Sequence, residues 1–369
     1  MPTIDETIDR IVSATEWNQR IAQVRLIPQH HGTGEHVGIF AAVARALYLP
    51  HLAPDFADVH EASFYGREHF LAAYGAASEA TSGFTRVTED DLTSALVGAP
   101  RTLLVFRTIL GLTKDEFAHS TVLAGGPSGL AQLSVAKVES MERQGTLTKP
   151  SQARVAAKTV CLVMDGSPLF GDPPAGLISK QQKPDTEGGW DSVGTFASGG
   201  VPYSVFLHQR HYGGAFRQIL DATSTKRGDL IEDAVEAMFS ERGIPFVRTG
   251  SHNQAEIATR FEVRVTPAPD FVVFDNAGNL RAMLECKGTS NGGTARDKAL
   301  RFARLRNESV RLGGIPLLAV LGGIGWARVN DALGPVVRDT EGRVFTLSTL
   351  NSMLEVAPFP GLIGTAGPA

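Results

Sequence analysis

The sequence predicts an α/β protein in which a mostly helical N-terminal region precedes a mixed sheet flanked by helices. Three observations lead to this fold class. Residues 1–150 carry apolar residues at helical spacing, interrupted by glycine and proline. From residue 227 onwards, apolar runs of strand length alternate with long amphipathic helical patterns. The proportions of hydrophobic (43%) and charged (20%) residues are those of a globular chain, and 369 residues suffice for two domains.

The helices expected in the N-terminal region follow one another closely. Residues 37–49 form one of them, because their apolar residues recur at helical spacing after Thr33 and Gly34, which suit an N-cap region. We therefore assign residues 1–150 to a helical accessory domain. The further helices are expected at 8–26, 67–80, 89–98, 99–111, 113–122 and 129–145.

The sequence changes character beyond this helical region. The apolar runs 159–166 and 201–207 have the length of strands. Between them, residues 167–200 are rich in Gly, Pro, Lys and Asp, which is typical of a functional loop or a linker. We assign residues 151–369 to a second domain, with its core at 227–325.

The C-terminal region predicts elements in the order α-β-β-β-α-β. Its first helix, 228–243, has apolar residues at helical spacing and ends at Gly243. Asn276–Gly278 forms a turn between two apolar runs, which predicts a hairpin. The strands are expected at 244–250, 269–275, 279–287, 315–323 and, beyond the core, 342–350, and the second helix at 294–314. The result is a mixed central sheet flanked by helices.

Three ionisable residues stand at the ends of these otherwise apolar strands. Glu285 and Lys287 are two residues apart and share a face of their strand, whereas Cys286 points the other way into the core. Asp270 begins the preceding strand and lies close to both if the two strands pair as a hairpin. Burying such carboxylates singly is costly, and a bound metal removes that cost. Two carboxylates suit Mg²⁺, which prefers oxygen ligands.

This arrangement resembles the PD-(D/E)XK nucleases, a superfamily best known from type II restriction endonucleases. The matching residues are Pro269-Asp270, a gap of fourteen residues, and then Glu285-Cys286-Lys287. The order of helix, three strands, helix and strand is also that of the superfamily's core, and the resemblance covers residues 227–369. It implies a restriction-endonuclease-like core.

The resemblance further implies Mg²⁺-dependent hydrolysis of DNA phosphodiester bonds. Asp270 and Glu285 correspond to the metal ligands, and Lys287 to the group that orients the attacking water or stabilises the developing charge. The superfamily often adds an acidic residue on the first core helix, for which Glu232 is the candidate and Glu236 the alternative. The alternative for the whole constellation is an ordinary ion pair on an α/β sheet.

Candidate DNA contacts follow from basic segments. Residues 287–311 carry seven cations against two anions, and three of the cations, Lys298, Arg301 and Arg304, are spaced three apart so that they could share one helix face. The alternative is a solvated helix face.

Two further segments are weaker candidates for DNA contact. Arg210, His211 and Tyr212 belong to a basic and aromatic segment, 208–218, which is either a DNA-contacting loop or an ordinary one. Residues 107–118 and 134–145 resemble a helix-turn-helix of the phage-repressor type, although a much longer stretch separates them, which favours a helical domain that packs on itself.

The resemblance favours a sequence-specific type II restriction enzyme that acts on double-stranded DNA. Cutting both strands needs two sites, so we expect a homodimer. One alternative is a repair or defence nuclease that recognises DNA structure or modification. Another is a non-catalytic DNA-binding protein built on a nuclease scaffold.

Composition excludes several other classes. The formal net charge of −4 argues against a globally basic nucleic-acid-binding protein. Two cysteines, Cys161 and Cys286, provide neither a disulfide framework nor a zinc cluster. No apolar run reaches the length of a membrane span, and the N-terminus lacks the basic start and apolar block of a signal peptide. We therefore expect a cytoplasmic protein with no membrane partner.

Overall fold

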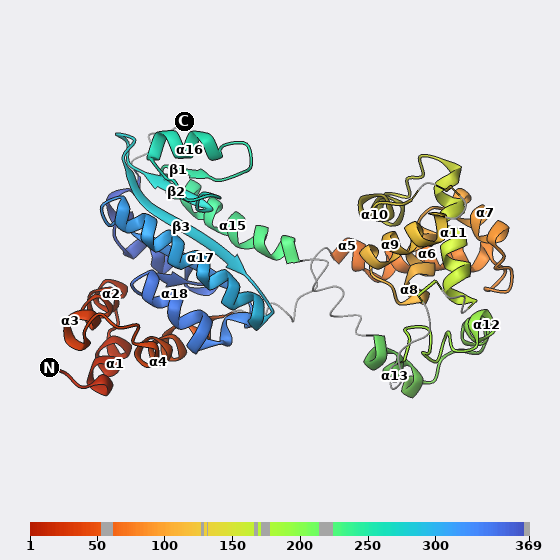
Figure 1. Ribbon diagram of the computed structural model, residues 1–369, viewed down its shortest axis with the longest axis horizontal. Coiled ribbons are helices and arrows are strands. Elements are labelled where there is room, and N and C mark those ends of the chain that lie inside the picture. Colours follow the sequence, from red (N-terminus) through yellow and green to blue (C-terminus); the bar gives the residue numbers. More distant parts are fainter. Residues whose placement is uncertain are drawn as a thin grey trace. The chain divides into compact units, whose positions relative to one another are not determined.

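The chain forms two compact units, and the middle of the sequence supplies one of them. The structure, a computed structural model, describes residues 1–52, 62–126, 129–130, 132–165, 169–170, 178–213 and 224–364. Unit 1 combines Met1–Asp58 with Ala222–Ala369, and unit 2 consists of Val59–Asp221 (Figure 1). The boundary predicted at residue 150 coincides with neither junction, because that residue begins a helix, α11 (Pro150–Met164), buried in the core of unit 2.

The described part of unit 1 is built around a five-stranded mixed sheet with the order β1-β2-β3-β4-β5. β1 pairs antiparallel with β2, and β2 with β3, whereas β3 pairs parallel with β4, and β4 with β5. The mixed sheet and the predicted hairpin between the second and third strands are therefore confirmed. The strands span Phe246–Arg248 (β1), Phe271–Phe274 (β2), Leu280–Gly288 (β3), Leu317–Gly322 (β4) and Val344–Phe345 (β5).

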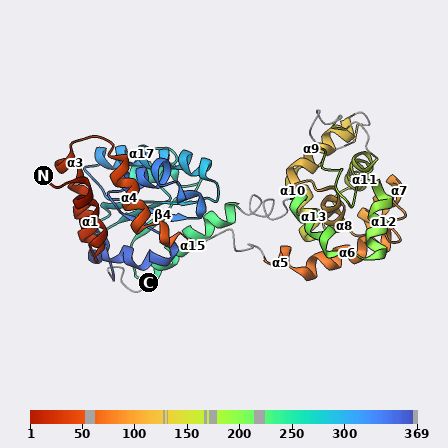
Figure 2. The ribbon, with the colours of Figure 1, turned by 90° about the horizontal axis from the view of Figure 1, so that it is seen from below.

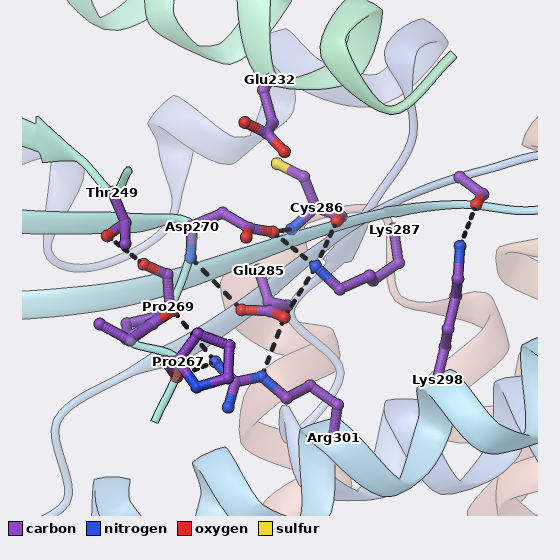
Figure 3. Close-up of polar contacts among 12 residues, drawn as sticks. Glu232, Thr249, Pro267, Pro269, Asp270, Glu285, Cys286, Lys287, Lys298 and Arg301 are labelled. Carbon is purple, nitrogen blue, oxygen red and sulfur yellow. Dashed lines mark hydrogen bonds and ion pairs between the residues drawn. The ribbon is translucent and has the colours of Figure 1, made fainter. Parts of the chain in front are cut away.

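Two long helices cover opposite faces of this sheet. α15 (Ser224–Glu241) lies against the face to which Cys286 points, and α17 (Gly292–Arg311) lies against the face that carries Glu285 (Figures 1 and 3). Asn291 caps the N-terminus of α17, because its side chain accepts hydrogen bonds from two backbone N–H groups of the first turn. Both helices were predicted, whereas α16 (Gln254–Phe261), between β1 and β2, was not.

The remaining short elements of unit 1 follow β4. The 3₁₀ turn η4 (Ile324–Ala327) and the π-helical turn η5 (Val329–Leu333) lead into α18 (Gly334–Asp339). After β5 the chain forms the 3₁₀ elements η6 (Leu347–Glu355) and η7 (Phe359–Gly361). The strand predicted over 342–350 is thus much shorter than expected, because the chain turns into η6 directly after Phe345.

The first 52 residues belong to the same core as the sheet. The ring centroids of Trp17 and Phe345 are 4.7 Å apart, and the Tyr48 hydroxyl donates a hydrogen bond of 2.8 Å to the Gly342 carbonyl. The helical region predicted over residues 1–150 is thus divided between the two units. Its first elements are α1 (Ile4–Ser13), α2 (Trp17–Arg25), α3 (Ile27–His31), α4 (Val37–Leu47) and the 3₁₀ turn η1 (Leu49–His51).

The regular elements in the described part of unit 2 are all helices (Figure 2). A buried ion pair joins two of its helices, since the Arg107 guanidinium contacts the fully buried carboxylate of Glu142 at 2.5 and 2.9 Å. The helices are α5 (Ala62–Tyr65), α6 (Arg67–Ala80), α7 (Glu89–Gly98), α8 (Thr102–Leu110), α9 (Lys114–Gly125), α10 (Val135–Gln144), α11, α12 (Gly189–Gly199) and α13 (Tyr203–Gly213).

Two predicted strands in this unit were wrong. The first of them, predicted over 159–166, falls on the C-terminal part of α11, which includes residues 159–164. The second, predicted over 201–207, falls on the start of α13, which includes residues 203–207. A continuous apolar run does not distinguish a buried strand from a helix that is buried on most sides. α11 is such a helix, because it packs against α7, α8 and α9 and buries Ala, Val and Met side chains around much of its circumference.

Candidate active site

The ends of β2 and β3 bring three charged side chains together at one point of the unit 1 sheet (Figure 3). The Lys287 Nζ lies 2.8 Å from Oδ2 of Asp270 and 2.8 Å from Oε1 of Glu285. It also donates a hydrogen bond of 3.0 Å to the Cys286 carbonyl. The two carboxylates therefore share one ammonium group.

Strand pairing explains this meeting. Phe271 of β2 is the partner of Leu284 of β3, so the residues just beyond this pair, Asp270 and Glu285, are also opposite each other. The Asp270 N–H donates to Oε2 of Glu285 at 3.3 Å, and the Cys286 N–H donates to Oδ2 of Asp270 at 2.8 Å. Backbone groups thus fix the orientation of both carboxylates before any ligand is considered.

Burial and charge determine the protonation of Lys287. The side chain of Glu285 is 2% exposed, whereas those of Asp270 and Lys287 are 21% and 23% exposed. Burial alone would lower the pKa of Lys287, but the neighbouring Glu285 and Asp270 carboxylates outweigh it and raise that pKa above its ordinary value. Lys287 is therefore a cation at neutral pH. It can donate hydrogen bonds and supply a positive charge, but as an ammonium group it cannot accept a proton as a general base.

Arg301 of α17 completes the charge balance on the same face. Its Nε donates to Oε1 of Glu285 at 3.0 Å, and its Nη2 donates to the carbonyls of Pro267 at 2.6 Å and Ala268 at 3.1 Å. The sequence predicted Arg301 as a DNA contact, but the structure directs its guanidinium inward, toward the carboxylate. Two cations, Arg301 and Lys287, thus balance the two carboxylates.

Glu232 approaches from the other side of the sheet. It projects from α15 on the face where the Cys286 thiol lies (Figure 3), and its carboxylate is 3.1 Å from the Arg248 guanidinium. Arg248 also contacts Asp233 at 2.7 Å and Glu236 at 2.5 Å. Burial, and next the Asp270 carboxylate, raise the pKa of Glu232, against the lowering effect of Arg248. The negative charge of Asp270 therefore affects the pKa of Glu232, although the Glu232 carboxylate is paired with Arg248.

The other two basic residues predicted on α17 differ in orientation. Lys298 donates to the Gly288 carbonyl at 2.6 Å, close to the end of β3. Arg304 is exposed, and within the described chain no hydrogen bond or ion pair involves its side chain. A step of three residues turns a helix by about 300°, so neighbouring members of this set are about 60° apart around the helix axis. Lys298 and Arg301 contact groups at or near the site, whereas Arg304 is exposed to solvent.

Arg210, His211 and Tyr212 have backbones in α13 of unit 2, which replaces the loop expected over the first part of 208–218. His211 is exposed. The side chains of Arg210 and Tyr212 and residues 214–218 lie outside the described residues. Their predicted contact with DNA stays a prediction.

Sequence reasoning missed Trp326 and Gly325 of η4. The fully buried Trp326 indole donates from Nε1 to the Lys287 carbonyl at 3.0 Å, and the Gly325 N–H donates to the Thr289 carbonyl at 2.9 Å. These bonds fix the backbone at the end of β3. The only signal in the sequence was a tryptophan shortly after a buried strand, which is insufficient to place it beside Lys287.

Asp270 and Glu285 supply the oxygen donors that Mg²⁺ prefers, so the residues fit this metal. In the described chain no group of three His, Cys, Asp or Glu side chains is arranged to hold a metal ion, and the two carboxylates hold the ammonium and guanidinium groups. A metal ion at this point would share these two carboxylates with the Lys287 ammonium and the Arg301 guanidinium.

Comparisons with known proteins return no match to a family model, a curated protein or a solved structure. None of the helices in the described ranges is long and apolar enough to cross a membrane. The functional assignment of the site rests on its own geometry and on the resemblance of its motif.

Proposed function

We propose that unit 1 is a Mg²⁺-dependent DNA endonuclease domain of PD-(D/E)XK type, with a restriction-endonuclease-like core. One observation supports this proposal above the others. The Lys287 Nζ lies 2.8 Å from a carboxylate oxygen of Asp270 and 2.8 Å from one of Glu285. The three residues meet at the ends of two paired strands, on a sheet with helices on both faces. The order α15-β1-β2-β3-α17-β4 around them is compatible with that core, with α16 as an addition.

The residues would divide the chemistry between them. Asp270 and Glu285 would hold the metal, with Glu232 as the predicted assistant. Mg²⁺, when bound, polarises a phosphoryl oxygen and lowers the pKa of a coordinated water. Lys287 remains an ammonium at neutral pH, so its role is to donate hydrogen bonds to the attacking water or to the negative charge that develops on the phosphate.

The proposed substrate is double-stranded DNA, and the proposed class is a sequence-specific type II restriction enzyme. The exposed Arg296 and Arg304 of α17 are available for phosphate contacts, which give affinity without sequence information. Cutting both strands requires two copies of the single site, which is the reason to propose a homodimer. Sedimentation of the protein with and without a DNA duplex tests this part separately.

The test is cleavage of plasmid DNA with Mg²⁺ by the wild-type protein and by Asp270→Asn, Glu285→Gln and Lys287→Met. We expect each variant to lose activity by on the order of 10³-fold, because each removes a ligand or charge that acts on the transition state. Asp297→Asn is the matched control, since Asp297 is an exposed carboxylate of α17 that the site does not use. It should cleave like the wild type.

Each outcome separates the candidate functions. Discrete fragments with ligatable 5′-phosphates support a restriction enzyme, and a smear of products supports a repair or defence nuclease. DNA binding without cleavage under any condition supports the non-catalytic alternative. Cleavage that persists in the three site variants contradicts the assignment of the site.

A further inference from the structure

The backbone in front of Asp270 has no regular structure, yet side chains hold it at several atoms. The Thr249 hydroxyl donates to the Pro269 carbonyl at 2.5 Å, and the Ala268 N–H donates to Oε1 of Gln254 at 2.7 Å. A separate contact joins the Arg264 N–H to Glu308 of α17. The segment that delivers Asp270 to the site is therefore positioned by residues of other elements.

Arg301 joins this segment to the site itself. Its Nη2 holds the carbonyls of Pro267 and Ala268, while its Nε donates to the carboxylate of Glu285. One planar guanidinium thus connects the carbonyls just before Asp270 with the side chain of the second acidic residue. Lysine has a single donor atom and cannot span these acceptors in the same way.

The surroundings of Arg301 do not suit a phosphate contact. Its side chain is only 13% exposed, and it is paired with a carboxylate that is 2% exposed. Turning it outward would leave the buried Glu285 carboxylate without one of its two cations, which is costly. Arg304, one turn further along α17, is exposed and provides a natural comparison.

We propose that Arg301 is a positioning residue, which fixes Glu285 and the Pro267–Asp270 segment in the same geometry, and not a DNA-contacting residue. Its catalytic consequence rests on the nuclease function proposed above. Loss of Arg301 therefore affects the rate of the chemical step and the rigidity of the segment, and leaves the number of phosphate contacts unchanged.

The experiment compares Arg301→Met and Arg301→Lys with Arg304→Met. Amide hydrogen exchange at Ala268 and Asp270 reports the rigidity of the segment, and DNA binding with Ca²⁺ in place of Mg²⁺ over a salt series reports phosphate contacts. For Arg301→Met we expect exchange at both amides to rise by about tenfold or more, kcat to fall by about tenfold or more with KM unchanged, and the salt slope to stay the same. Arg301→Lys should be intermediate in all effects.

Arg304→Met should leave the exchange of both amides unchanged and should reduce the salt slope by about 0.9 if it contacts a phosphate. A reduced salt slope in Arg301→Met together with unchanged exchange would overturn the proposal, because it would identify Arg301 as a phosphate contact. If the methionine variant does not fold, Arg301→Lys decides in the same way. If the wild-type protein neither binds nor cuts DNA, the nuclease function fails, while the exchange measurement still decides the positioning role.

Discussion

Lys287 and a metal ion would use the same two carboxylates, Asp270 and Glu285. The Lys287 ammonium group lies 2.8 Å from an oxygen of both Asp270 and Glu285, and a divalent cation at this point would bind the same two carboxylates. A cation that enters must compete with an ion pair in a largely buried environment, where charge interactions are stronger than in water. If the proposed function holds, the lysine that would assist the reaction would also weaken metal binding.

The first prediction concerns this competition. Lys287→Met removes the ammonium and leaves the site with one more uncompensated negative charge, so Mn²⁺ should bind about tenfold more tightly, or about 1.4 kcal/mol. Isothermal titration of Mn²⁺ measures this effect without any need for activity. Arg296→Met, which removes an exposed cation of the same helix, should change the affinity little. Unchanged or weaker binding to Lys287→Met would show that the ammonium does not compete with the metal.

The sequence alone could predict which strand residues meet, but not what surrounds them. Alternation along β3 and the turn at Asn276–Gly278 were sufficient to bring Asp270, Glu285 and Lys287 together. The role of Arg301 was not predictable, since it depends on how α17 is rotated about its axis and shifted along β3. Helical periodicity identifies the buried face of a helix, but not which residue of a neighbouring element each position contacts.

At the level of elements, the 3₁₀ turn η4 supports the end of β3. Gly325 lies so close to the β3–α17 connection that an added Cβ would be 2.8 Å from the carbonyl oxygens of both Thr289 and Asn291. These are backbone atoms, which do not move aside as the end of a flexible side chain does. Only glycine therefore fits at this position without displacing either η4 or the connection.

The second prediction follows from that close approach. Gly325→Ala should lower the free energy of unfolding of unit 1 by about 1–3 kcal/mol, the usual cost of overpacking. Urea unfolding measures the change. Gly228→Ala is the control of opposite sign, because its Cβ meets no atom within 4 Å and it lies inside α15, where alanine stabilises a helix by up to about 1 kcal/mol. Equal stability of Gly325→Ala and wild type would mean that η4 is free to move.

Element types were predictable where the pattern had a clear period. The amphipathic patterns of α15 and α17 and the alternation in the β2–β3 hairpin identified their elements. The strand predictions at 159–166 and 201–207 were wrong because a run of successive apolar residues fits either a strand or a helix. Which of the two forms depends on the tertiary surroundings. α16 was missed because its eight residues, Gln254–Phe261, are too few to establish a period.

At the scale of the whole molecule, Glu341 links the beginning of unit 1 to its end. Its carboxylate contacts the guanidinium groups of Arg25 in α2 at 2.6 Å, Arg306 in α17 at 2.7 Å and Arg343 next to β5 at 2.9 Å. Burial alone would raise the pKa of Glu341, but the three guanidinium groups outweigh it and lower the pKa to about 2. This cluster joins the N-terminal helices to the sheet.

The third prediction tests that cluster. A carboxylate whose pKa is lowered on folding stabilises the folded state above its unfolded pKa of about 4.5, and this contribution is lost as the pH falls through about 2. The shift corresponds to about 3 kcal/mol at most, which solvent screening reduces to about 2 kcal/mol. Glu341→Gln should therefore lower the free energy of unfolding by about that amount at pH 7, and the difference from wild type should shrink below pH 4.5.

Urea unfolding at pH 7 and at about pH 3 measures this difference. Glu355→Gln serves as the control, because Glu355 is exposed, and it should show no comparable loss at either pH. A loss in Glu341→Gln that is independent of pH would assign the effect to shape and packing, with no contribution from charge.

The division of unit 1 into two stretches has a consequence for biosynthesis. Tyr48 and its partner Gly342 are 294 residues apart in the chain. At usual rates of translation, roughly 15–60 s therefore pass between the synthesis of the N-terminal helices and that of the elements they pack against, which include η5, α18 and η6. Unit 2 is continuous in sequence, and its helices can pack while the rest is still being made. The apolar faces of the N-terminal helices thus stay exposed while unit 2 is synthesised, and a chaperone that binds them in this interval would protect the nascent chain.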